Sequence, residues 1–169
     1  MIFPLVLGSV WGIALSYCDI RWRVLPNWLT LGGAAVALVG RFGFGGWPLL
    51  VDGFAAAAVA GCFLLIPFLA RGAGGGDVKM LFAAGAIAGW ERLFTMLWVT
   101  SLAGVVMGVL MLAAGSLDGS RLRHFARCAF DWRYDRKAGA LALAPKDASR
   151  CRIPFSVPVA VGLFVALVR

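Results

Sequence analysis

Long apolar stretches, broken by short charged or glycine- and proline-rich segments, run along most of the chain. About 20 consecutive apolar residues are enough for a helix to cross the hydrocarbon of a bilayer. The pattern therefore predicts an all-α, polytopic membrane helix bundle with about six transmembrane helices. The predicted spans are residues 2–18, 25–40, 51–70, 74–90, 93–115 and 153–168.

Composition excludes a water-soluble globule. Hydrophobic residues make up 62% of the chain and charged residues 14%, whereas soluble domains average about 45–50% and about 25%. Too little polar surface remains to cover such a fold in water. We expect residues 1–169 to form a single membrane-embedded domain with no separate soluble domain. The first apolar stretch has no basic segment before it and no small-residue cleavage site after it, so it is expected to be a retained span.

The net charge of +8 comes from 16 basic and 8 acidic residues. In a membrane protein, basic loops mark the cytoplasmic side, so we expect contact with anionic lipid and no nucleic-acid partner. With both termini outside, 13 basic residues face the cytoplasm and three do not, which predicts an N-out, C-out orientation. Most of the inside charge falls in a basic cytoplasmic loop at about 116–150. The three outside residues are Arg41, Arg92 and Arg169.

The four cysteines form no C-x-x-C pair, so neither a zinc site nor a redox motif is expected. The sequence suggests no metal site and no cofactor. The cysteines are Cys18, Cys62, Cys128 and Cys151.

Two aspartates stand at the ends of apolar stretches. Asp19 ends the first predicted span and Asp77 begins the fourth, so the predicted orientation places both on the cytoplasmic side. A carboxylate at the edge of hydrocarbon is costly, and its default interpretation is functional. At about 4 Å and an effective dielectric constant of about 20, two carboxylates repel by roughly 4 kcal/mol, so a close pair retains one proton. Such a pair can activate a water molecule: one group removes its proton and the other donates to a carbonyl.

The glycines before the second aspartate allow two interpretations. Gly74, Gly75 and Gly76 let the backbone turn tightly and let a substrate strand approach closely, because no Cβ stands in the way. Equally, they can form a loop that starts a helix, with Asp77 as its cap.

The remaining polar residues near the aspartates also have two interpretations each. Pro26 and Asn27 either support the site or simply begin the second helix. Lys79 either biases Asp77 toward ionisation or anchors a helix end. Arg23 either orients the first aspartate or follows the positive-inside bias, and the sequence favours the bias.

Together these motifs resemble a known family. Residues 74–79 (Gly-Gly-Gly-Asp-Val-Lys) resemble the signature of the GxGD intramembrane aspartyl peptidases. Asp19 with residues 23–30 (Arg-Val-Leu-Pro-Asn-Trp-Leu-Thr) is similar to the D-x-x-x-R-x-I-P-N-x-L-T region of type IV prepilin peptidases. Residues 153–162, including Pro154, resemble the I-P-F-G-P segment that opens the family's last span, with Ser156 in place of the glycine and Val157 inserted before the next proline.

The resemblance implies a multi-pass endopeptidase of the bacterial inner membrane, with Asp19 and Asp77 as its catalytic pair. Its substrates would be prepilins or pseudopilins, which lose a basic leader at the cytoplasmic face, and the pilus-assembly machinery is a further expected partner. Larger members carry an extra domain with two C-x-x-C pairs and methylate the new N-terminus. This chain looks like the compact type associated with Flp (tight-adherence) pili, so methyl transfer is not expected.

The alternative is a small transporter or a structural subunit of a secretion or pilus complex. There the aspartates would relay protons or bind cations, with Lys79 as a charge partner. The absence of recognisable inverted repeats and of acidic residues in mid-span speaks against it. Asp52, at the outer end of the third span, is predicted to tolerate replacement by asparagine.

Overall fold

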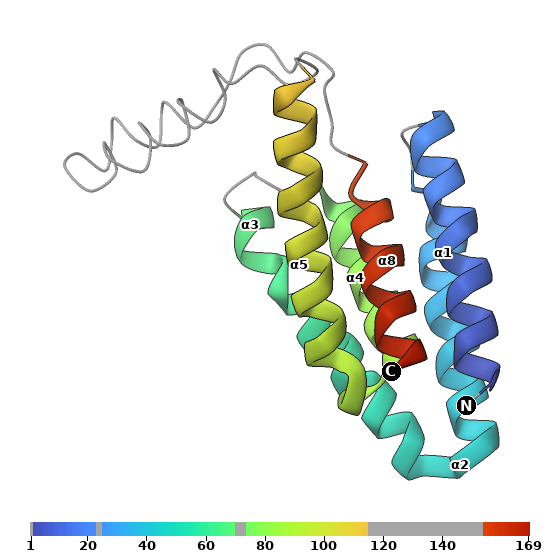
Figure 1. The fold of residues 1–169 in the computed structure, drawn as a ribbon. Coiled ribbons are helices and arrows are strands. Elements are labelled where there is room, and N and C mark those ends of the chain that lie inside the picture. The colour runs from blue at the N-terminus through green and yellow to red at the C-terminus, as the bar shows by residue number, and fades with distance from the viewer. Residues whose placement is uncertain (1, 23–24, 70–73, 115–153) are drawn as a thin grey trace. The chain divides into compact units, whose positions relative to one another are not determined.

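The computed structural model describes residues 2–22, 25–69, 74–114 and 154–169, and every regular element in these ranges is a helix. This confirms the predicted all-α class. The helices are α1 (Ile2–Trp22), α2 (Asn27–Phe63), α3 (Leu65–Leu69), α4 (Gly75–Ala88), α5 (Trp90–Ala113) and α8 (Ser156–Val168) (Figure 1). The predicted basic loop at 116–150 lies outside the described residues.

Helix α2 consists of two helical arms that meet at a bend. Gly46 has φ 63° and ψ −152°, a backbone conformation that residues other than glycine rarely adopt. Figure 1 shows that the chain reverses direction at this end of α2. Hydrogen bonding agrees: Arg41 and Asp52 are 11 residues apart yet in contact, whereas a straight helix would separate them by about 16 Å. The first arm (27–45) and the second arm (47–63) correspond to the second and third predicted spans. The prediction that residues 41–50 separate the two spans as a non-helical segment was wrong, because these residues are helical apart from the bend.

Contacts divide the chain into two compact units, Met1–Val106 with Pro154–Arg169 and Met107–Ile153. Of the second unit, the structure describes the end of α5, which runs to Ala113, and residue 114. All the contacts discussed below belong to the first unit.

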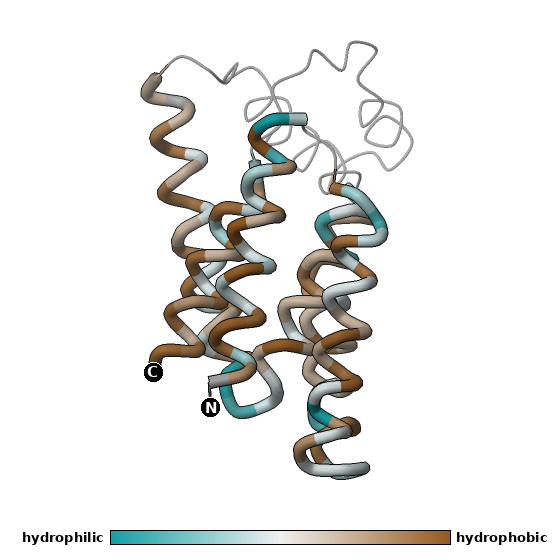
Figure 2. The backbone as a smooth tube through the Cα atoms, turned by 90° about the vertical axis from the view of Figure 1, so that its right-hand side faces the viewer, coloured by the Kyte–Doolittle hydropathy of each residue, from teal (hydrophilic) through white to brown (hydrophobic). Residues whose placement is uncertain are grey.

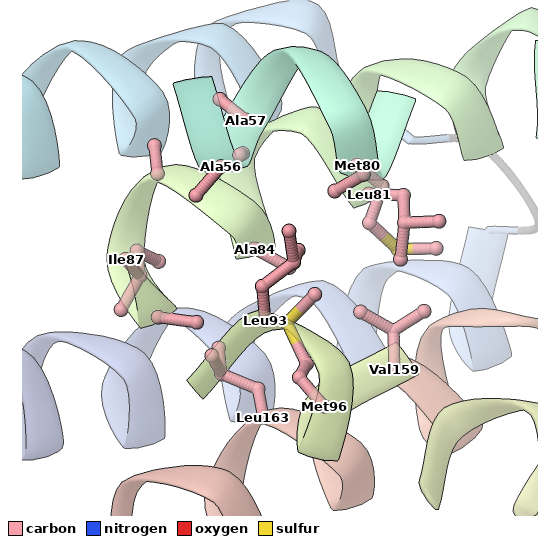
Figure 3. Packing of buried hydrophobic residues seen from close by; sticks show 14 of the residues in the cluster. Ala56, Ala57, Met80, Leu81, Ala84, Ile87, Leu93, Met96, Val159 and Leu163 are labelled. Carbon is pink, nitrogen blue, oxygen red and sulfur yellow. The ribbon is translucent and has the colours of Figure 1, made fainter. Parts of the chain in front are cut away.

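Helix α4 forms the core of the first unit. Apart from the partly exposed Phe82, every residue from Met80 to Ala88 is buried. The second arm of α2 lies very close to α4 because the facing residues are small: a Cβ on Gly85 would lie 2.7 Å from the carbonyl oxygen of Ala56. Figure 3 shows further core side chains converging from α5 and α8: Leu93, Met96, Val159 and Leu163.

Small residues also bring α8 close to its neighbours. A Cβ on Gly12 of α1 would lie 3.2 Å from the Cβ of Ala160, and one on Gly162 would lie 2.8 Å from the carbonyl oxygen of Met96 in α5. Glycine and alanine let helix backbones approach in this way, as is typical of membrane helix interfaces. Helix α8 is therefore held between α1 and α5.

Three described helices are long and apolar enough to cross a membrane: Phe3–Trp22, Asn27–Phe63 and Trp90–Met111. Helix α4, with 14 residues, and α8, with 13, are about 20 Å long and shorter than the predicted fourth and sixth spans. Figure 2 shows that the most hydrophilic residues lie near the helix ends or near the bend in α2. The structure is consistent with a helical membrane protein.

Candidate active site

Asp19 lies in the last turn of α1 and is half-buried against the start of α8. Its Oδ2 atom accepts a hydrogen bond from Ser156 Oγ at 2.6 Å and another from the backbone N–H of Ser156 at 3.2 Å. Ser156 is the first residue of α8 and only 1% exposed. The carboxylate therefore sits at the positive end of a helix, where unpaired N–H groups favour an anion.

Asp77 is the third residue of α4 and is also half-buried. Its Oδ2 atom accepts a hydrogen bond from the N–H of Gly74 at 3.0 Å, which satisfies one of the unpaired donors at this helix start. Gly74 itself occupies the N-cap position. The sequence offered Asp77 as the cap of this helix; in the structure Gly74 is the N-cap, and the Asp77 carboxylate contacts it from the third helical position.

The glycines next to Asp77 face different neighbours. Gly74 has φ −84°, a value open to any residue, but a Cβ there would lie 3.1 Å from Asp77 Oδ2 and crowd the carboxylate. A Cβ on Gly75 would contact Phe68 at 3.5 Å, and one on Gly76 would lie 3.3 Å from the side chain of Leu25. Glycine at position 74 is therefore explained by the space that the Asp77 carboxylate needs, and not by an unusual backbone angle.

Lys79 and Asn27 join the two sequence motifs. Lys79 Nζ donates a hydrogen bond to Asn27 Oδ1 at 3.0 Å, from the first turns of α4 to the start of α2. Pro26 acts as the N-cap of α2, and its carbonyl oxygen accepts hydrogen bonds from the N–H groups of Leu29 and Thr30. Lys79 thus has an observed partner in Asn27, and both interpretations of Lys79 stay predictions. Arg23 lies outside the described residues.

These contacts gather both aspartates at one end of the first unit. The end of α1 and the starts of α2, α4 and α8 lie there together, as Figure 1 shows. Pro154 precedes α8 at the same end, and its carbonyl oxygen accepts a hydrogen bond from the N–H of Val157 at 3.4 Å. Two carboxylates 58 positions apart in the sequence thus share one end of the bundle.

Sequence reasoning missed the polar contacts of two residues, Ser156 and Arg41. Ser156 was noted only as a departure from the family's glycine, although serine at a helix start is a capping signal. Arg41, counted only as an outside charge, lies at the opposite end. Its Nε donates to the carbonyl oxygen of Ala86 at 2.8 Å and its Nη1 lies 2.9 Å from Asp52 Oδ2.

Around Arg41 is a hollow of about 760 Å³, lined by apolar residues and by the charged residues Arg41, Asp52, Glu91 and Arg92. It lies at the far end of α4 from Asp77 and is separate from the two aspartates. Within the described ranges, no group of three His, Cys, Asp or Glu residues is placed to hold a metal ion.

Comparison with known proteins gives two kinds of match. Residues 6–109 match the model of the type IV leader peptidase family, a range that includes both aspartates but not α8. The chain is 31% identical over 115 residues to a prepilin leader peptidase/N-methyltransferase of Pseudomonas putida, covering 63% of this chain and 40% of that protein. It is 33% identical over 109 residues to a protein of the same name from Aeromonas hydrophila, covering 57% and 36%.

The matched region therefore spans about two fifths of the length of these curated relatives. No solved structure matches the chain.

Proposed function

The chain belongs to the type IV leader peptidase family, and on that basis we propose that it is a membrane aspartyl endopeptidase that removes the basic leader from prepilin or pseudopilin precursors. The observation on which this depends is the position of Asp19 and Asp77. Both fall in the region matched by the family, and both lie at one end of the same helical unit. In this proposal they are the catalytic pair.

The two carboxyl groups would divide the chemistry of peptide hydrolysis. One, ionised, removes a proton from a bound water as the water attacks the scissile carbonyl carbon. The other, protonated, donates a hydrogen bond and then its proton to the carbonyl oxygen, which gives a tetrahedral gem-diol. As this intermediate collapses, the C–N bond breaks, the leaving amine takes the proton held by the first carboxyl group, and a hydroxyl of the gem-diol returns a proton to the second. Where two carboxyl groups share one water molecule, their like charges cannot easily both ionise, which favours the singly protonated pair that this exchange requires.

We place this end of the unit at the cytoplasmic face of a bacterial inner membrane. Arg21 and Lys79 lie at the end with the aspartates, and the positive-inside rule assigns basic residues near helix ends to the cytoplasm. The proposed topology has six spans: α1, the two arms of α2, α4, α5 and α8, with both termini outside. Helix α4 can be short because its neighbours bury most of it from Met80 to Ala88, so this part does not have to meet lipid.

The expected substrate has an apolar helix that enters the bilayer and a basic leader that stays in water. An active site at the membrane edge reaches the junction between them. Because the protein's own charges are mostly positive, recognition of the leader depends on the shape of the site and on the aspartates rather than on loop charge. The pilus-assembly machinery would receive the product.

The test is co-expression with a pilin precursor, followed by mass spectrometry of the pilin N-terminus. The wild type should release the leader, and Asp19→Asn and Asp77→Asn should each abolish release while the protein still inserts in the membrane. Glu91→Gln is the matched control, because it removes an exposed carboxylate at the start of α5, near the opposite end. Full processing by either aspartate variant excludes the pair. Ion flux without any cut pilin would favour a transporter instead.

A further inference from the structure

In the part of the chain that the structure describes, hydrogen bonds reach only one of the two carboxylate oxygens of Asp19. Both hydrogen bonds to this side chain come from Ser156 and both end on Oδ2. Within the described residues, no hydrogen bond reaches Oδ1. We propose that Ser156 is a positioning residue: it fixes the rotation of the Asp19 carboxylate so that Oδ1 faces the reacting water. This inference rests on the proposed peptidase function.

The chemistry of the two donors supports this assignment. A backbone N–H can only donate, and a carboxylate oxygen has two lone pairs with which to accept. The N–H and the hydroxyl of Ser156 supply two donors to Oδ2, as many as its two lone pairs can accept. Among the described residues, this leaves Oδ1 as the atom of Asp19 that is available to a water molecule, or to a proton taken from it.

The packing around Ser156 keeps this contact in place. Its side chain is almost completely buried, so bulk water competes poorly for the hydroxyl, and hydrogen bonds to a charged group are among the stronger ones in proteins. The close contact of Gly12 with Ala160 brings α1 and α8 near enough for Ser156 to reach Asp19. A carboxylate on a lone helix end would rotate freely; here two donors from a neighbouring helix restrict it.

Only the hydroxyl depends on the residue type. Glycine, which occupies this place in the segment that residues 153–162 resemble, would still supply the backbone N–H but not the Oγ–H. At 2.6 Å the hydroxyl makes the shorter of the two hydrogen bonds. Ser156→Gly and Ser156→Ala therefore remove the hydroxyl donor and leave the backbone N–H donor. Their effect on activity measures the orienting role of the hydroxyl while α8 stays in place.

The experiment measures kcat and KM of the purified full chain on a pilin precursor in detergent. We expect Ser156→Ala and Ser156→Gly to lower kcat about tenfold, with little change in KM, because the hydrogen bond orients a catalytic carboxyl group rather than binding substrate. Ser156→Thr, which restores a hydroxyl, should recover more activity than Ser156→Ala. Ser101→Ala is the matched control, since Ser101 donates only to the carbonyl oxygen of Leu97 in its own helix.

A double-mutant cycle on unfolding in detergent tests the contact without using activity. Ser156→Ala and Asp19→Ala should be clearly non-additive, because each removes the same hydrogen bond. Additive effects in the cycle would overturn the inference, and so would an unchanged kcat in Ser156→Ala and Ser156→Gly. Neither result would affect the proposed function, provided that the wild type cuts the precursor. A wild type that cuts no precursor would instead remove the proposed function, and the positioning role with it.

Discussion

Arg41 Nη1 lies 2.9 Å from Asp52 Oδ2, so an ion pair joins the two arms of α2 across the bend at Gly46. The same Asp52 oxygen accepts a hydrogen bond from the N–H of Trp90 at 3.2 Å, at the start of α5. Arg41 also binds the carbonyl oxygens of Ala86 and Ile87 at the end of α4. One charged pair thus connects α2, α4 and α5 at the end opposite the aspartates.

Replacing Asp52 tests how much this pair stabilises the fold. The Arg41 side chain is 13% exposed, and Asp52→Ala would remove its ion-pair partner while leaving its hydrogen bonds to the carbonyl oxygens of Ala86 and Ile87. Breaking a fully buried ion pair lowers the free energy of unfolding by about 3–5 kcal/mol. Because Asp52 is 35% exposed and water screens its charge, we expect a loss of about 2 kcal/mol here. Asp52→Asn keeps an oxygen acceptor and should cost about 1 kcal/mol or less. Thermal unfolding in detergent measures both.

Pilin processing should survive in Asp52→Asn wherever the variant is folded, because this residue lies away from the proposed catalytic pair. The tolerance of Asp52→Asn expected from the sequence thus stays a prediction, and it concerns activity rather than stability. Equal stability of wild type and Asp52→Ala would contradict the role given to the ion pair.

Variants of Asp77 separate helix capping from chemistry. Asp77→Asn keeps an oxygen that can accept from the Gly74 N–H, so we expect nearly unchanged stability and no cleavage. Asp77→Ala loses both the helix-capping contact and the carboxyl group. Its free energy of unfolding should be about 1 kcal/mol lower than that of the wild type, the usual effect of removing such a contact at a helix start. Unfolding curves and pilin mass spectra on the same preparations check this. Normal cleavage by Asp77→Asn would reduce the residue to a capping role.

Gly85 tests the close packing of α4 against the second arm of α2. A Cβ there would lie 2.7 Å from the carbonyl oxygen of Ala56 and 2.9 Å from the Cα of Ala57, and backbone atoms cannot move aside cheaply. We expect Gly85→Ala to destabilise the protein by about 1–3 kcal/mol. Gly32→Ala is the control: its Cβ would meet nothing within 4 Å, so it should be neutral or slightly stabilising. Equal melting temperatures for the two variants would argue against this packing.

The Lys79–Asn27 hydrogen bond joins the two motif segments across the site. We expect Lys79→Met and Asn27→Ala each to slow pilin processing a few-fold, and the double variant to be no slower than either, because both remove one interaction. Asn27→Asp keeps the acceptor and should process at close to the wild-type rate. Initial processing rates measure this, and multiplied effects in the double variant would show that the two residues act separately.

Much of this arrangement was predictable because its signals are local. Apolar runs of helical length indicated the helices, and the positive-inside bias predicted a common end for Asp19 and Asp77. The bend in α2 was less accessible: the predicted spans ended at residue 40 and resumed at 51, which left the residues between them outside any helix. Helix in fact continues on both sides of one residue with positive φ, because a single glycine is enough to reverse the chain.

The order of apolar and polar residues along the chain was enough to establish the helical class, the apolar segments and the two aspartates, since each depends on near neighbours. Contacts between distant segments needed the folded molecule. Ser156 and Asp19 are 137 positions apart, and Arg41 and Ala86 are 45 apart. Which faces of two helices meet depends on how side-chain volumes fit together throughout the core, and a local pattern of residues does not specify that fit.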